Sequence, residues 1–203
     1  MSSSRNGWQA EIILAPMAIT LQRRMLYIPV LHIDTNLINA RQKLIPVNQL
    51  EKWSADGVIL INMAGTARNE ALAGGNAQRL RKANQQIFTT TAPEDPGAGQ
   101  FKAIETLLFP GGAHDENQRN DVRIVADAIH YAAILVTNDG GSKSQPGGIL
   151  GNRRALSQQV GVRILSAEEA VDFVRSKIRE RDNFNRQVAR EFGGTLPNWT
   201  DKD

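Results

Sequence analysis

Short, mostly apolar runs that alternate with longer helical patterns constrain the fold of this chain most strongly. Each run is too short for a helix and is bounded by polar or turn-forming residues; the runs span residues 28–34, 57–62, 134–138 and 162–165. The clearest helical pattern covers residues 117–132, with its apolar side chains along one side. Strands that alternate with helices favour a parallel sheet. We therefore predict an α/β fold, a three-layer α/β/α sandwich around a central, mainly parallel sheet, with a C-terminal helical extension.

The length of 203 residues suits one domain with additions at both ends. We expect an N-terminal extension over residues 1–27, a single domain over 28–170, and a C-terminal helix and tail over 171–203. Ser166 is a suitable N-cap for the last helix, because acidic residues follow it in the first turn. The glycine pair 193–194 should end this helix, and residues 195–203 look like a loose tail.

The residue types present narrow the chemistry. The chain has no cysteine, which excludes disulfides, zinc ribbons and cysteine nucleophiles. Its three scattered histidines argue against a histidine-rich zinc site. Oxygen ligands remain, and these bind hard divalent cations.

Charge and hydropathy bear on the partners and location of the protein. The net charge of +3 permits a polyanionic partner without requiring one. The apolar stretch 12–19 is short, contains a proline and follows an acidic residue, so it fits neither a membrane span nor a signal peptide. We therefore expect a cytoplasmic protein that has no membrane partner.

Acidic residues follow two of the predicted strands. Asp34 ends the first apolar run and Asp139 ends the run that begins at residue 134. The carboxyl ends of adjacent parallel strands face a common crevice, where ligands bind. Glu70 and Asp121 lie in helical patterns that the fold would bring to the same edge. Gathered carboxylates repel one another and are stable as anions around cations such as Mg²⁺ or Mn²⁺, so the set predicts a metal-dependent phosphoester enzyme.

Each acid also has a purely structural explanation. Asp34 and Asp139 could be turn residues at the ends of strands, and Asp121 could favour the start of a helix. Glu70 alone is more typical of a solvated helix face. It is the combination of all four positions that favours a metal site.

Two stretches around these acids resemble the PIN-domain ribonucleases, a family related to toxins of bacterial toxin–antitoxin pairs. The stretch Leu31–Ile38 is an apolar strand followed by Asp-Thr-Asn, like the opening strand of that family. The stretch Asp121–Asp139 is similar to the family's third-acid helix, which leads into a strand ending in Thr-x-Asp with the same eighteen-residue step. Glu70 falls where the family has a helical glutamate. The resemblance covers roughly residues 28–166, and the glycine-rich stretch 140–151 departs from the family pattern.

The resemblance implies an endoribonuclease that uses Mg²⁺ or Mn²⁺ to hydrolyse RNA phosphodiester bonds. The catalytic and metal-binding residues would be Asp34, Glu70, Asp121 and Asp139. Neighbouring polar residues would orient these ligands or a water molecule without binding the ion themselves; they are Asn36, Thr137 and Asn138. An antitoxin or a second copy of the chain as a partner is left open.

Basic residues suggest where a substrate would lie. Lys143, Arg153 and Arg154 flank the loop that follows Asp139, so we expect them to contact substrate phosphates. A further group is interleaved with acidic residues in the last helix and is expected to form a solvated face; it comprises Arg175, Lys177, Arg179, Arg181, Arg186 and Arg190.

Two other functions compete with the ribonuclease. A phosphatase of the haloacid-dehalogenase type also begins with an aspartate that ends a strand, but it needs a second aspartate where this chain has Asn36. The other alternative is a PIN-like scaffold that binds RNA or protein without catalysis.

Overall fold

A five-stranded parallel sheet forms the centre of the protein. The computed structural model describes residues 21–38, 43–73, 77, 88–89, 97–141 and 147–203. The strands are β1 (Leu31–Ile33), β2 (Ile61–Met63), β3 (Phe88–Thr89), β4 (Ile134–Val136) and β5 (Arg163–Leu165). They pair in the order β3-β2-β1-β4-β5, and every pairing is parallel. The predicted α/β class and parallel sheet are confirmed.

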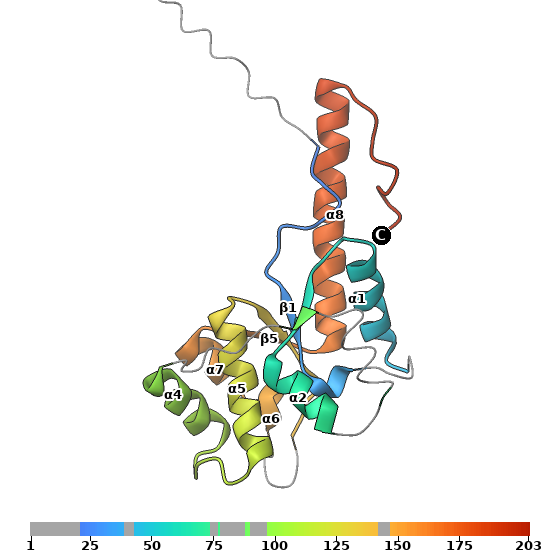
Figure 1. Cartoon of the computed structure of the whole chain (residues 1–203). Coiled ribbons are helices and arrows are strands. Elements are labelled where there is room, and N and C mark those ends of the chain that lie inside the picture. The colour runs from blue at the N-terminus through green and yellow to red at the C-terminus, as the bar shows by residue number, and fades with distance from the viewer. Residues whose placement is uncertain (1–20, 39–42, 74–76, 78–87, 90–96, 142–146) are drawn as a thin grey trace, which may run out of the picture.

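Helices cover both faces of this sheet (Figure 1). They are the 3₁₀ helix η1 (Thr35–Leu37) and the α-helices α1 (Ile45–Ala55), α2 (Gly65–Ala73), α4 (Ala98–Leu108), α5 (Glu116–His130), α6 (Gly148–Gly151), α7 (Arg153–Val160) and α8 (Ala167–Phe192). On one side α1 packs against α8, and on the other α4 packs against α5 and α7 (Figure 1). The predicted three-layer arrangement is therefore confirmed.

The second strand lies further along the chain than predicted. Residues 57–62 were expected to form it, but β2 begins at Ile61. Gly57 has a left-handed φ of 72°, which ends the turn after α1. The carbonyl of Val58 then accepts a hydrogen bond from the N–H of Leu26, ahead of β1, and that of Leu60 accepts one from Leu31, the first residue of β1. Val58 and Ile59 are apolar because they are buried beside the sheet, and not because they extend β2, whereas Leu60 is exposed.

The last helix is continuous and well capped. Ser166 accepts a hydrogen bond from the backbone of Glu169, whose side chain accepts one from the backbone of Ser166, so the start of α8 is a capping box. The helix ends before Gly193, as predicted. It projects beyond the rest of the protein, and residues after its end run back along its side (Figure 1).

Two expectations about the C-terminus were wrong. Arg181 was assigned to a solvated face but is 2% exposed, and its guanidinium binds the carboxylates of Asp182 and Asp203 at 2.8 and 2.9 Å. It also lies 4.3 Å from the centre of the Trp199 ring. Arg24 binds the second oxygen of Asp203, and so joins the residues before β1 to this cluster. The tail 195–203 is therefore held against α8, and we call Arg24, Arg181, Asp182 and Asp203 the C-terminal clasp.

None of the helices within the described ranges is both long enough and apolar enough to cross a bilayer. The division into domains at residues 27 and 170 stays a prediction, although α8 runs through the second boundary without a break.

Candidate active site

The candidate site lies where the strand order changes direction. The chain passes from β1 to β2 on one side and reaches β4 on the other, so the ends of β1 and β4 adjoin at a topological switch point. In the register of these strands Ile33 pairs with Val136. Asp34 follows at once, and Asp139 comes three residues after Val136. The sequence-based expectation that these two acids share one edge of the sheet is thus met by the topology.

The carboxylate of Asp34 is buried and surrounded by hydrogen-bond donors. It accepts hydrogen bonds from the Thr137 hydroxyl at 2.7 Å, the Asn36 amide at 2.8 Å and the backbone N–H of Thr35 at 2.5 Å. Burial nevertheless raises the pKa of Asp34 to about 6, and the charges of Glu70 and Asp139 act in the same direction. The donors hold the carboxylate in place but do not remove the cost of burying its charge.

Glu70 is tied into the same edge by two residues that sequence analysis did not single out for this role. One carboxylate oxygen accepts a hydrogen bond from the Thr35 hydroxyl at 2.7 Å, and the other accepts one from the Asn120 amide at 2.8 Å. Thr35 belongs to η1 and Asn120 to α5, so both contacts depend on how α2 packs against these elements. No local pattern in the sequence could have revealed them.

The pKa of Asp121 depends on the charges of the other three acids. It is half-buried on α5, and its pKa is raised to about 7. Burial is the largest cause, followed by the charges of Asp34, Asp139 and Glu70 in that order. A carboxyl with such a pKa resists ionisation near neutral pH, and a bound cation would relieve that resistance.

Asp139 is held by the turn that begins α6. Its carboxylate accepts hydrogen bonds from the backbone N–H of Ile149 at 2.8 Å and of Gly141 at 3.2 Å. Gly148 lies against it with a left-handed φ of 52°. A Cβ at position 148 would stand 2.7 Å from the Asp139 carboxylate and 2.5 Å from the Gly141 nitrogen, so only glycine fits. Gly141, Gly148 and Ile149 therefore position Asp139, a role that the sequence pattern did not reveal.

The four carboxylates fit a hard divalent cation by their chemistry. Oxygen donors are what Mg²⁺ and Mn²⁺ prefer, and the raised pKa values of Asp34 and Asp121 reflect mutual repulsion in addition to burial. Across the described ranges, however, no three acidic or histidine side chains are already grouped around one point as metal ligands would be. The site therefore has the negative charge of a metal centre, but its described side chains are not arranged around a single point as metal ligands are.

The predicted accessory residues have varied surroundings. Thr137 links two of the acids, because its hydroxyl donates to Asp34 and accepts a hydrogen bond from the backbone N–H of Asp139 at 3.0 Å. Asn36 donates to the Asp34 carboxylate and to the Thr137 hydroxyl. The side chain of Asn138 instead accepts a hydrogen bond from the backbone N–H of Ala167 at the start of α8.

The predicted phosphate-binding residues are only partly placed. Lys143 lies outside the described residues. Arg153 forms an ion pair with Glu169 at 2.7 Å, and both side chains are more than 40% exposed. Arg154 is exposed at the start of α7.

Comparisons with known proteins give a distant likeness. No family model matches the chain, and no curated protein matches it. Among solved structures, VapBC2 from Rickettsia felis, bound to a DNA fragment from its promoter, is 15% identical with a TM-score of 0.47, and the match covers 68% of this chain and 98% of that one. FitAB bound to an IR36 DNA fragment is 16% identical with a TM-score of 0.44, covering 68% and 94%. VapBC-1 from nontypeable Haemophilus influenzae is 16% identical with a TM-score of 0.47, covering 68% and 98%. These values are too low to transfer a function to this chain.

Proposed function

We propose that the protein is a metal-dependent endoribonuclease of the PIN type, which hydrolyses RNA phosphodiester bonds at the C-terminal edge of its sheet. The observation that carries this proposal is a set of hydrogen bonds from two threonines that connects three of the four acids. The Thr137 hydroxyl donates to the Asp34 carboxylate and accepts from the backbone N–H of Asp139, and Thr35 donates its backbone N–H to Asp34 and its hydroxyl to Glu70. Thr35 and Thr137 thus tie the positions of three of the acids together, which solvated carboxylates would not require.

The proposed chemistry follows from the charge of the site. One or two divalent ions at this edge would polarise a phosphoryl oxygen, lower the pKa of a bound water and stabilise the leaving oxygen. Asp34 and Asp139 would bind the ion directly, and Glu70 and Asp121 would bind it directly or through water. Thr137 and Asn36 would keep the Asp34 carboxylate oriented, because both donate hydrogen bonds to it.

The proposed substrate is RNA because of the resemblance around Asp34 and over Asp121–Asp139. Arg154 is the described residue best able to meet a phosphate, since it is exposed at the start of α7. Arg153 would have to exchange its partner Glu169 for a phosphate, and such a surface ion pair is weak enough for that exchange. An antitoxin or a second copy as partner remains a prediction.

The test is Mn²⁺-dependent cleavage of a generic RNA by the wild type and by Asp34→Asn. This substitution keeps the shape of the side chain but removes its charge. We expect cleavage to fall at least about a hundredfold, because losing even an indirect partner of a metal ligand costs ten- to a hundredfold. Asp172→Asn is the matched control, since Asp172 is an exposed residue of α8. Equal cleavage by the wild type and Asp34→Asn would contradict the proposal.

The same assays separate the alternatives. Release of phosphate from small monoesters without cleavage of RNA would favour the phosphatase. Tight RNA binding with neither activity would favour the scaffold.

A further inference from the structure

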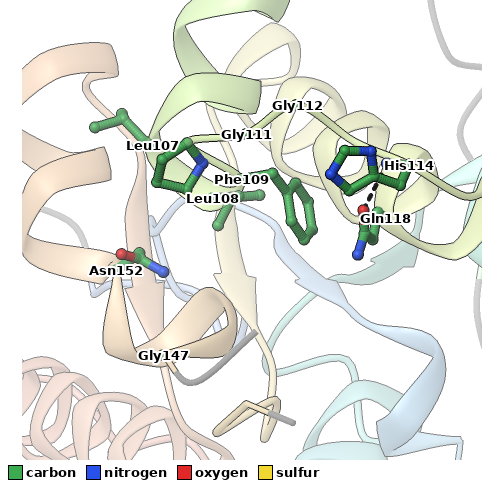
Figure 2. A pocket seen from close by; sticks show the side chains of 10 residues that line it. Leu107, Leu108, Phe109, Gly111, Gly112, His114, Gln118, Gly147 and Asn152 are labelled. Atoms are coloured by element: carbon green, nitrogen blue, oxygen red, sulfur yellow. Dashed lines mark hydrogen bonds between the residues drawn. The ribbon is translucent and has the colours of Figure 1, made fainter. Parts of the chain in front are cut away.

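A pocket of about 280 Å³ opens near the candidate site, between the loop after α4, the first turn of α5 and the short helix α6 (Figure 2). Its volume is close to the lower end of the range of about 300–1,000 Å³ for pockets that bind small molecules. A single flat group the size of a nucleobase would suit it better than a large cofactor.

The described walls of this pocket carry no carboxylate, ammonium or guanidinium group. They combine the apolar surface of Leu107 and Phe109 with the backbone of the glycine pair 111–112, the imidazole of His114 and the amide of Gln118 (Figure 2). Of the described residues that line it, none is aspartate, glutamate, lysine or arginine. A phosphate or carboxylate would find no lysine or arginine among these residues, whereas an uncharged aromatic ring with polar edges would find both an apolar surface and hydrogen-bonding groups.

Two amide side chains of the pocket are held in fixed orientations. The Gln118 Oε1 accepts a hydrogen bond from the backbone N–H of His114 at 2.7 Å, and the Asn152 Nδ2 donates one to the carbonyl of Gly148 at 2.8 Å. The opposite end of each amide has no described protein partner, which leaves one donor and one acceptor. Amides in this state are suited to the edges of bases.

The pocket is joined to the carboxylate site through the backbone. Gly147 lines the pocket, and the next residue, Gly148, packs against the carboxylate of Asp139. The N–H of Leu150 also donates to the carbonyl of Asp139 at 3.0 Å. A strand whose phosphate lay at Asp139 would therefore have a neighbouring nucleotide within reach of the pocket.

From these observations we infer that the pocket receives one unpaired nucleobase of the RNA strand, next to the bond that is cleaved. This inference rests on the proposed ribonuclease function. It adds a selection rule, because a base can enter only when it is unpaired and turned out of a stack. The protein would then cleave single-stranded segments and loops, with a base preference set by the pocket.

The first experiment titrates the protein with adenosine, guanosine, cytidine and uridine, followed by amide chemical shifts. The titration is run without divalent ions, and nucleosides carry no phosphate, so the phosphate contacts proposed for the carboxylate site do not contribute to their binding. At least one nucleoside should shift the amides of Gly111, Gly112 and Gly147. Gly111→Leu should weaken this binding at least about tenfold, the cost of losing one stacked base. A side chain is sterically allowed there, since a Cβ would meet only the His114 ring, at 3.6 Å.

The matched control is Gly99→Leu. Gly99 is exposed on α4, and a Cβ at this position would meet nothing within 4 Å. This variant should bind nucleosides as the wild type does.

The second experiment replaces single nucleotides of a cleaved RNA by abasic residues. One abasic position beside the cleavage site should slow the wild type about tenfold, while the same change should have little effect on Gly111→Leu. If nucleosides leave the pocket amides unshifted and no abasic position slows cleavage, the inference is wrong. If nucleosides bind but the wild type cleaves no RNA, the pocket stands and the ribonuclease proposal fails.

Discussion

The protein gathers charged side chains in two places, and the two clusters are built on opposite principles. In the C-terminal clasp, the buried carboxylates of Asp182 and Asp203 meet the guanidinium groups of Arg181 and Arg24. At the carboxylate site, four acids act on one another, and the pKa of Asp121 rises to about 7. The clasp balances its charges within the chain, so its role is structural. The carboxylate site leaves its charges to be balanced from outside, as expected of a site that binds a cation.

The largest expected effect is a loss of stability when the C-terminal clasp is broken. Arg181→Ala leaves Asp182 and Asp203 buried without their principal partner. Breaking a buried pair in this way costs about 3–5 kcal/mol of the free energy of unfolding. Denaturation by urea measures this loss. Arg179→Ala, an exposed neighbour on α8, should cost under about 0.5 kcal/mol. Equal stability of the two variants would mean that the clasp does not hold the tail.

A smaller loss should follow from disturbing the support of Asp139. Gly148→Ala forces a Cβ into atoms 2.5–2.7 Å away at a positive φ, and overpacking of this kind costs about 2 kcal/mol. Because the displaced atoms include the Asp139 carboxylate, RNA cleavage should also fall about tenfold or more at temperatures where the variant is folded. Gly151→Ala is the control, since a Cβ there meets nothing within 4 Å. Full activity of Gly148→Ala would show that the turn does not position Asp139.

Removing a charge from the carboxylate site should increase the free energy of unfolding, whereas breaking the C-terminal clasp decreases it. The pKa of Asp121 lies near 7 when folded and near 3.8 when unfolded, so this group lowers the stability progressively from pH 3.8 upward, and the loss is complete above pH 7. Asp121→Asn should therefore raise the free energy of unfolding at pH 8, without metal, by about 1 kcal/mol after allowance for partial exposure. The gain should shrink as the pH falls below 7, and vanish near 3.8. Thermal melts between pH 5 and 8 measure it, and the same variant should lose Mn²⁺-dependent cleavage.

If Asp121→Asn is more stable than the wild type but does not cleave RNA, the charge of Asp121 serves function at the expense of stability. A destabilised variant at pH 8 would instead mean that Asp121 serves the fold, and would remove the contrast with the clasp. Asp172→Asn, exposed on α8, should change neither property.

The smallest expected effect is a change in KM for RNA when one predicted phosphate contact is removed. Arg154→Ala should leave stability within about 0.5 kcal/mol, because the residue is exposed. If it contacts a phosphate, the variant should raise KM for RNA a few-fold with little change in kcat, and the dependence of KM on salt should become less steep. An unchanged KM and salt dependence would exclude Arg154 from the interface.

The sequence could predict those features that depend on local pattern. Alternating strands and helices specified a parallel sheet, and a parallel sheet brings Asp34 and Asp139 to one edge whatever the rest of the chain does. The helix expected over residues 117–132 from its periodicity is α5, which spans Glu116–His130 in the structure.

Contacts between distant segments could not be predicted in this way. The burial of Arg181 depends on Asp203 and on Arg24, which lies 157 positions before it. Its local pattern of mixed charges is the same as that of a solvated helix face. The contact from Asn120 to Glu70 likewise depends on the packing of α5 against α2.

The most direct test of the central claim is to locate Mn²⁺ by anomalous diffraction from crystals grown with the ion. The four acids should bind it, so we predict an anomalous peak between the carboxylates of Asp34 and Asp139, and its loss in Asp34→Asn. Crystals that contain Mn²⁺ but show no peak at this edge of the sheet would contradict the account.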